Sequence, residues 1–190
     1  VFACRQARDE LHRALLAGLK TRNAQTIFGA IAAELKTVGV ELLPAWRFME
    51  AAMPPPGNLS RRAPTPEEQV DIELGCRVAK TTSGLEIGQT VVVKQGTILA
   101  VEAFEGTDET IARAGRLGGP GVVVVKVAKR GHDMRFDIPV VGPHTIKNLA
   151  KIKAAVLAIE AGRAIILERE KVIQEADRRG ISLVAVGVSE

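Results

Sequence analysis

QTVVVKQGTILAVEAFEG, residues 89–106, is the stretch of sequence that decides the fold. Its β-branched residues form two strand-like runs on either side of Gln95-Gly96, which is a turn signal. We therefore predict two neighbouring strands joined by a tight turn.

Helix and strand patterns alternate after this hairpin. Residues 107–117 are predicted to form a helix capped by Thr107, and GVVVVKVAK (residues 121–129) a buried strand. The later predicted elements are a helix at 143–153, strands within 154–161 and 164–169, a helix at 170–179 and a strand at 181–187. Alternation of this kind is typical of a layered α/β domain, and the hairpin implies that its sheet is mixed.

The N-terminal part is predicted to be mainly helical. Apolar residues recur on one stripe in residues 5–19 and again in residues 26–38. VELL (residues 40–43) resembles a short strand, and residues 45–53 a short helix. We assign residues 1–53 to this mainly helical segment.

Proline marks the one internal boundary. MPPPGNLSRRAPTP (residues 53–66) is predicted to be a loop or linker, because proline removes a backbone donor and fixes φ. Thr65, Pro66 and Glu68 then form a helix start with a capping box, and this helix should run to about residue 82. We assign residues 54–66 to a Pro-rich linker and residues 67–190 to an α/β domain.

Composition narrows the functional classes. The 190 residues are 46% hydrophobic and 25% charged, which is typical of a globular protein. No apolar run approaches the ~20 residues that cross a bilayer, and because the sequence opens on Val1 we expect an N-terminal part to precede it. Cys4 and Cys76 lack metal-site spacing, so reduced thiols of a cytoplasmic protein are expected. The net charge of +4 favours anionic partners, but 3% aromatic residues and no tyrosine argue against a nucleic-acid surface.

Two stretches carry candidate chemistry. In EGTD (residues 105–108) a glycine lies where a strand turns into a helix, and the free N–H groups of such a turn bind anions. Its acidic residues could instead bind a cation, or Thr107 and Asp108 could simply stabilise the helix start. KRGHDMRFDIPVVG (residues 129–142) holds two aspartates among cations. It is either a solvated loop or a site where carboxylates bind magnesium and cations bind phosphate.

Other known site motifs do not occur. The sequence contains no dinucleotide-binding GxGxxG, no Walker motif, no GxSxG and no HExxH.

Several short motifs occur in order over residues 85–145. They are Ile87-Gly88-Gln89, AVEA (residues 100–103), EGTD, and Arg135-x-Asp137-x-Pro139, followed by Gly142 and Thr145. Taken together, this block resembles the C-terminal domain of the LpxI-type UDP-2,3-diacylglucosamine pyrophosphatases.

The resemblance implies a function and a setting. Members of that family hydrolyse the diphosphate of UDP-2,3-diacylglucosamine to UMP and 2,3-diacylglucosamine 1-phosphate, in lipid A synthesis. They use a divalent metal, usually Mg²⁺, and have an N-terminal Rossmann-like domain, of which residues 1–53 would be a remnant. They dimerise through the C-terminal domain. We therefore expect a cytoplasmic homodimer with a UDP-linked lipid substrate, in peripheral contact with the cytoplasmic face of the inner membrane.

The resemblance also ranks the candidate residues. It places the catalytic aspartate at Asp137, which is also an expected metal ligand, and ranks Asp133 below it. Apart from the resemblance, the charges of the two stretches make Asp108 a further expected metal ligand and assign phosphate binding to Lys129 and Arg135. The expected substrate-binding residues are Lys129, Arg135, Gln89, Glu105, Gly106, Thr107 and Thr145. Arg130 and His132 depart from the family's usual residues, so no role is carried over to them. The alternative is a UDP-lipid or nucleotide binding module without catalysis.

Overall fold

The computed structural model describes residues 10, 13–21, 24–44, 46–129, 133–136 and 138–187. These residues fall into two compact units. The N-terminal unit comprises the described residues within 1–47 together with 133–136, and the α/β unit comprises those within 48–129 and 138–187.

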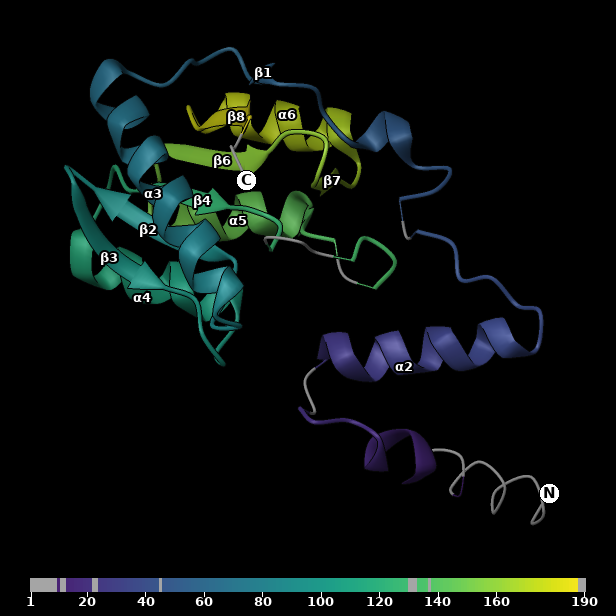
Figure 1. Cartoon of the computed structure of the whole chain (residues 1–190). Coiled ribbons are helices and arrows are strands. Elements are labelled where there is room, and N and C mark those ends of the chain that lie inside the picture. Colours follow the sequence, from purple (N-terminus) through teal and green to yellow (C-terminus); the bar gives the residue numbers. More distant parts are fainter. Residues whose placement is uncertain are drawn as a thin grey trace. The chain divides into compact units, whose positions relative to one another are not determined.

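The α/β unit is built on a six-stranded mixed sheet (Figure 1). The strand order is β1-β8-β6-β4-β2-β3. β4, β6 and β8 are parallel, β2 and β3 form an antiparallel hairpin beside β4, and β1 pairs antiparallel with β8. The bounds are β1 (Gly57–Asn58), β2 (Thr90–Lys94), β3 (Thr97–Val101), β4 (Val123–Lys126), β6 (Val156–Glu160) and β8 (Ser182–Val186). The predicted α/β fold with a mixed sheet is confirmed, and within the stretch predicted as a linker two residues form β1.

The hairpin turn is where the sequence predicts it. Gln95 and Gly96 both have positive φ, 50° and 74°, as the tightest hairpin turns require. The buried carboxylate of Asp71 accepts hydrogen bonds from both of their backbone N–H groups, at 2.8 and 2.7 Å. The turn is thereby fixed to the helix that carries Asp71.

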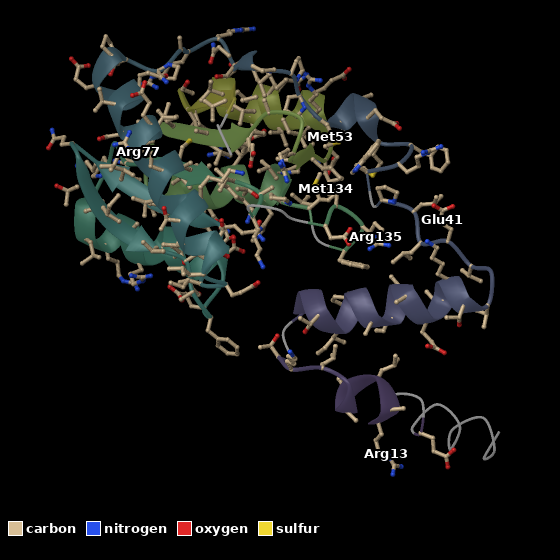
Figure 2. All side chains as sticks on the ribbon, viewed as in Figure 1. Arg13, Glu41, Met53, Arg77, Met134 and Arg135 are labelled. Atoms are coloured by element: carbon tan, nitrogen blue, oxygen red, sulfur yellow. The ribbon has the colours of Figure 1, made fainter. Side chains whose placement is uncertain are left out.

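Helices cover both faces of the sheet (Figure 1). α3 (Pro66–Gly84) packs on one face, and α4 (Thr107–Gly118), α5 (Pro143–Lys151) and α6 (Arg169–Arg178) pack on the other. α3 begins with the predicted capping box: the Thr65 hydroxyl accepts from the Glu68 N–H, and the Glu68 carboxylate accepts from the Thr65 N–H. Arg77, labelled in Figure 2, lies on the exposed side of this helix.

Successive valines of the central strands face opposite layers. Val91 and Val93 pack with the α3 layer, whereas Val92 packs with the layer of α4, α5 and α6. A glycine in α3 makes close packing possible, because a Cβ at Gly75 would lie 2.5 Å from Val125 Cγ2. The core therefore depends on a close approach of α3 to the sheet.

A second sheet is small. β5 (Val140–Val141) pairs in parallel with β7 (Ile165–Ile166). β5 ends immediately before Gly142, so this sheet fixes the entry into α5.

The N-terminal unit contains α2 (Ala24–Thr37), which confirms the helix predicted at residues 26–38, and a helical turn at residues 13–17. The Phe28 ring stacks on Phe136 at a centroid distance of 5.7 Å.

Two predictions for the segment after α2 are wrong. VELL is not a strand, because an apolar tetrapeptide forms one only with a partner strand, and here Val40 and Leu43 are exposed. In place of a helix over residues 45–53, the described residues form a turn at 46–48 and the short helix η1 (Glu50–Ala52) in the α/β unit. In the part of the chain that the structure describes, no helix combines the length and apolarity needed to cross a bilayer.

Candidate functional site

An open pocket of about 350 Å³ lies in the α/β unit where β3 and β4 end. Its lining comes from the start of α4, the end of β4 and the start of α5, and consists of Glu105, Gly106, Thr107, Asp108, Lys126, Val140, His144 and Thr145. Open α/β sheets place their ligands at the carboxyl ends of their strands. The pocket is therefore in the position expected of a ligand site.

The start of α4 leaves backbone donors at this pocket. Gly106 occupies the N-cap position with φ of 82°, and no side chain caps the helix. The first N–H groups of a helix have no intrahelical acceptor and carry partial positive charge, which favours an anion. The predicted capping role of Thr107 is wrong, because Thr107 is the first residue of the helix and its hydroxyl has other partners.

The start of α5 faces the same pocket. Gly142 is the N-cap and Pro143 the first helical residue, a position that suits proline because its missing N–H would have no partner there. The Gly142 N–H donates to the Thr145 hydroxyl at 3.4 Å. Two helix N-termini thus contribute to one pocket, and both favour a bound anion.

Lys126 is the residue that sequence reasoning missed here. Its Nζ donates to the Thr107 hydroxyl at 2.7 Å, and that hydroxyl donates to Glu102 Oε1 at 2.8 Å. Glu102 Oε2 in turn accepts from the Gln89 backbone N–H at 3.2 Å. The sequence held a signal for this residue, since the lysine that directly follows a run of buried valines lies at the end of the strand, where its ammonium can reach solvent.

The Glu105 carboxylate is held by two side chains of α4 and by one backbone N–H of the turn. Its carboxylate accepts from Arg113 at 2.5 Å, from the Thr110 hydroxyl at 3.2 Å and from the Ala103 N–H at 3.2 Å. Backbone hydrogen bonding, followed by the bond from Arg113, lowers the pKa of the Glu105 carboxyl. Glu105 therefore stays ionised and orders the loop in front of α4.

Asp108 and His144 meet across the pocket. Asp108 Oδ2 lies 3.5 Å from His144 Nδ1, and both side chains are exposed. Sequence reasoning did not select His144, although it follows the Gly-Pro helix start directly. This pair joins a carboxylate and an imidazole at the mouth of a site that otherwise favours anions.

A buried ion pair lies at the end of the neighbouring strand β6. Lys80 Nζ contacts both carboxylate oxygens of Glu160, at 2.8 and 2.9 Å, and the two side chains are only 3% and 2% exposed. Burial, followed by the charge of Glu160, raises the pKa of the nearby Cys76 thiol to about 11. Cys76 is therefore a neutral core residue.

Lys129 lies just beyond the end of β4. Its ammonium pairs with the Glu86 carboxylate. Burial lowers the pKa of Lys129.

The N-terminal unit contains another pair of predicted site residues. Arg135 Nε and Nη2 donate to the Asp133 carboxylate at 2.6 to 3.1 Å. This ion pair raises the pKa of Arg135. Arg135 also lies over the Phe136 ring, 5.0 Å from its centroid. Met134 and Arg135 are labelled on this turn in Figure 2.

The comparisons with known proteins identify the family. A family model described as the LpxI C-terminal domain matches residues 55–184. The chain belongs to this family. A curated relative, the UDP-2,3-diacylglucosamine pyrophosphatase LpxI of Caulobacter vibrioides, is 35% identical over 165 residues, which is 83% of this chain and 59% of that protein. The chain thus spans 59% of the length of that relative.

Similarity to solved structures is low. A dCMP deaminase from the cyanophage S-TIM5 matches with 12% identity and a TM-score of 0.40, covering 65% of this chain and 100% of that one. Acinetobacter baumannii RibD matches with 16% identity and a TM-score of 0.34, covering 63% of this chain and 35% of that one. Neither likeness supports a conclusion about the LpxI domain.

The residues considered for an LpxI site fall into four groups. The pocket brings together Glu105, Gly106, Thr107, Asp108 and Thr145. The Gln89 backbone N–H donates to Glu102, which binds the pocket residue Thr107, and Lys129 pairs with Glu86. Asp133 and Arg135 belong to the N-terminal unit. Asp137, Arg130 and His132 lie outside the described residues.

The described donors fit a magnesium ion only in part. Among the residues that the structure describes, no three His, Cys, Asp or Glu side chains are grouped so as to hold a metal. Asp108 does present an exposed carboxylate beside the pocket. Mg²⁺ is commonly held by one or two carboxylates, its own waters and substrate phosphate oxygens. A single protein carboxylate at a phosphate pocket is compatible with that mode of binding.

Proposed function

We propose that this protein, in its full-length form, hydrolyses UDP-2,3-diacylglucosamine to UMP and 2,3-diacylglucosamine 1-phosphate, a step in lipid A synthesis. Membership of the LpxI family, whose curated relative is named a UDP-2,3-diacylglucosamine pyrophosphatase, is the observation that carries the proposal. The pocket between the starts of α4 and α5 supports it, because a diphosphate is the kind of anion that such a pocket binds.

In this proposal the diphosphate lies against the helix starts. The backbone N–H groups at Thr107 and Asp108 donate to phosphate oxygens, and the Lys126 ammonium neutralises charge beside them. Water adds across the anhydride: its oxygen bonds to one phosphorus, and the bond from that phosphorus to the bridging oxygen breaks. Fixed donors that face the developing charge stabilise this transition state more than they stabilise the substrate.

The residues of the 129–142 stretch complete the proposed site. Asp137 positions the attacking water or binds the metal, and Lys129 and Arg135 balance phosphate charge. Asp108, Asp133 and Asp137 are the proposed metal ligands, and a bound Mg²⁺ would supply neutralisation of the diphosphate charge.

The test of catalysis uses the full-length protein. UMP release from UDP-2,3-diacylglucosamine is measured with Mg²⁺ for the wild type, for Asp137→Ala and for Asp137→Asn. Glu109→Ala is the matched control, because Glu109 is an exposed carboxylate on α4 that does not line the pocket. We expect turnover in the wild type and the control and its loss in both Asp137 variants. A folded Asp137→Ala protein with wild-type turnover would refute the assigned role. Substrate binding without UMP release over a range of divalent metals would support the non-catalytic binding module instead.

The proposed partners follow from the same family. We propose a homodimer formed through the α/β unit, working at the cytoplasmic face of the inner membrane. Exposed apolar side chains such as Phe104 and Leu85 support a peripheral contact with lipid. Sedimentation equilibrium tests the dimer, and flotation with anionic vesicles tests the contact. A monomer at micromolar concentration, or no flotation, would contradict the respective proposal.

A further inference from the structure

The buried Lys80–Glu160 pair has no part in the proposed chemistry, yet it is a costly feature to keep. Both side chains are almost fully buried. Removing two opposite charges from water carries a large penalty, and apolar side chains of the same volume often stabilise a protein at least as well. Stability alone is therefore a poor explanation for the pair.

Both members of the pair also bind the backbone of Ala128. Lys80 Nζ donates to the Ala128 carbonyl at 3.0 Å, and Glu160 Oε2 accepts from the Ala128 N–H at 2.8 Å. The preceding Val127 N–H donates to the Gln89 carbonyl at 3.0 Å. The chain that leaves β4 is thus fixed at two successive residues, from α3 and β6 on one side and from the start of β2 on the other.

The loop after α3 contacts the next residue, Lys129. Glu86, two residues beyond the end of α3, pairs with Lys129, whose side chain is 13% exposed. Glu86 has φ of 62°, a conformation that non-glycine residues adopt only where the surrounding contacts support it. α3 and the loop after it therefore hold residues 128 and 129 at the carboxyl end of β4.

We propose that Lys80 and Glu160 are positioning residues for the reaction: as a buried clamp on Ala128, they fix Lys129 at the carboxyl end of β4. The inference rests on the proposed function, since diphosphate hydrolysis is what requires Lys129 in a defined place. Neither Lys80 nor Glu160 touches substrate. They act through the backbone that they hold.

The test compares three clamp variants with one control in the full-length protein. Lys80→Met removes the donor to the Ala128 carbonyl, and Glu160→Gln leaves the buried Lys80 ammonium without its carboxylate. The double variant Lys80→Gln/Glu160→Gln replaces the pair by two neutral amides that can bond Ala128, and in both Glu160 variants Arg163 Nε, 3.7 Å from Glu160 Oε1, also loses that carboxylate. The control is Asp71→Asn. Asp71 is another buried carboxylate that binds two backbone N–H groups, but it does so at the hairpin, at the opposite end of the strands.

Two readouts separate positioning from stability. The first is kcat and KM for UMP release per folded molecule, measured well below the Tm of each variant. The second is hydrogen exchange at residues 126–129. We expect the single clamp variants to lose about 10- to 100-fold in kcat with little change in KM, as a small misplacement of reacting groups can do, and to lose exchange protection at Ala128 and Lys129. The double variant should recover part of both, and Asp71→Asn should lower Tm only.

Every outcome decides the proposal. Wild-type kcat and wild-type protection in folded Glu160→Gln would overturn it, as would an equal loss of kcat in Asp71→Asn. If Lys80→Met does not fold, the double variant is compared with Asp71→Asn. A larger loss of kcat in the double variant than in Asp71→Asn supports the clamp, and an equal or smaller loss refutes it. If the wild type itself releases no UMP, the proposed function fails. In that case hydrogen exchange at residues 126–129 is the one remaining test of whether the pair holds Ala128 and Lys129.

Discussion

Replacing Lys126 by methionine probes the pocket most sharply, because the change removes a charge and keeps much of the side-chain volume. Lys126 is the sole lysine or arginine among the described residues that line the pocket. The Thr107 hydroxyl accepts from Lys126 and also donates to Glu102, so it keeps a partner when Lys126 is replaced. The local network should therefore survive the substitution, and the loss should fall mainly on the bound anion.

The expected size of the effect follows from that one interaction. A hydrogen bond to a charged group contributes about 1.5–3 kcal/mol, which corresponds to about 10- to 150-fold in kcat/KM. The free energy of unfolding should fall by only about 1 kcal/mol, because the bond that is lost joins a half-buried ammonium to a hydroxyl that keeps its other partner. Lys126→Arg keeps the charge with a different donor geometry, so it should fall between the wild type and Lys126→Met.

The assay is UMP release by the full-length protein over a range of substrate concentrations, with Tm measured for each variant. Lys147→Met is the matched control, because it makes the same change of charge on the exposed side of α5. We expect the control to keep wild-type kcat/KM at low ionic strength. If folded Lys126→Met stays within about twofold of the control, the pocket does not bind the diphosphate as reasoned.

The remaining predictions concern the turn, the thiol and the metal. Gly106→Ala should lower the free energy of unfolding by about 1–2 kcal/mol, because φ of 82° suits glycine alone, and urea titration checks this; an unchanged midpoint would contradict the assigned backbone strain. Cys76 has a pKa of about 11 when folded against 9.0 as its ordinary value. Since the unfolded thiol gives up its proton first, stability should fall as pH rises from about 9 to about 11. Cys76→Ala should lack that part of the fall, and an identical pH profile would refute the shift. EDTA should abolish UMP release and added Mg²⁺ should restore it; full activity in EDTA would exclude the proposed metal dependence.

Local signals in the sequence were sufficient for most of the fold. Gln95-Gly96 predicts a hairpin because few residue pairs adopt two positive φ angles, and Thr65-Pro66 with Glu68 predicts a helix start because its donors are satisfied within four residues. The strand predicted for VELL is wrong for the opposite reason. A strand forms only beside a partner strand, and these four residues carry no information about whether a partner is present.

The site could be predicted only where its residues are close in sequence. EGTD was placed correctly at a strand-to-helix turn, but the bonds of Thr107 to Glu102 and Lys126 depend on how β3, β4 and α4 come together. The Lys80–Glu160 pair joins positions that no local pattern connects, so it became visible only once α3 lay against the sheet. The role of Asp137 remains a prediction from the family resemblance.

Amide chemical shifts can show directly whether a diphosphate binds at the pocket. UDP is titrated with Mg²⁺ into the ¹⁵N-labelled protein, and the backbone N–H shifts are followed residue by residue. We expect the largest changes at Gly106, Thr107, Asp108 and Thr145, and weaker changes in Lys126→Met. A separate pocket is lined by residues that include Arg62, Lys153 and Arg179. Unchanged shifts at the four residues, with changes around this other pocket instead, would contradict diphosphate binding between the starts of α4 and α5.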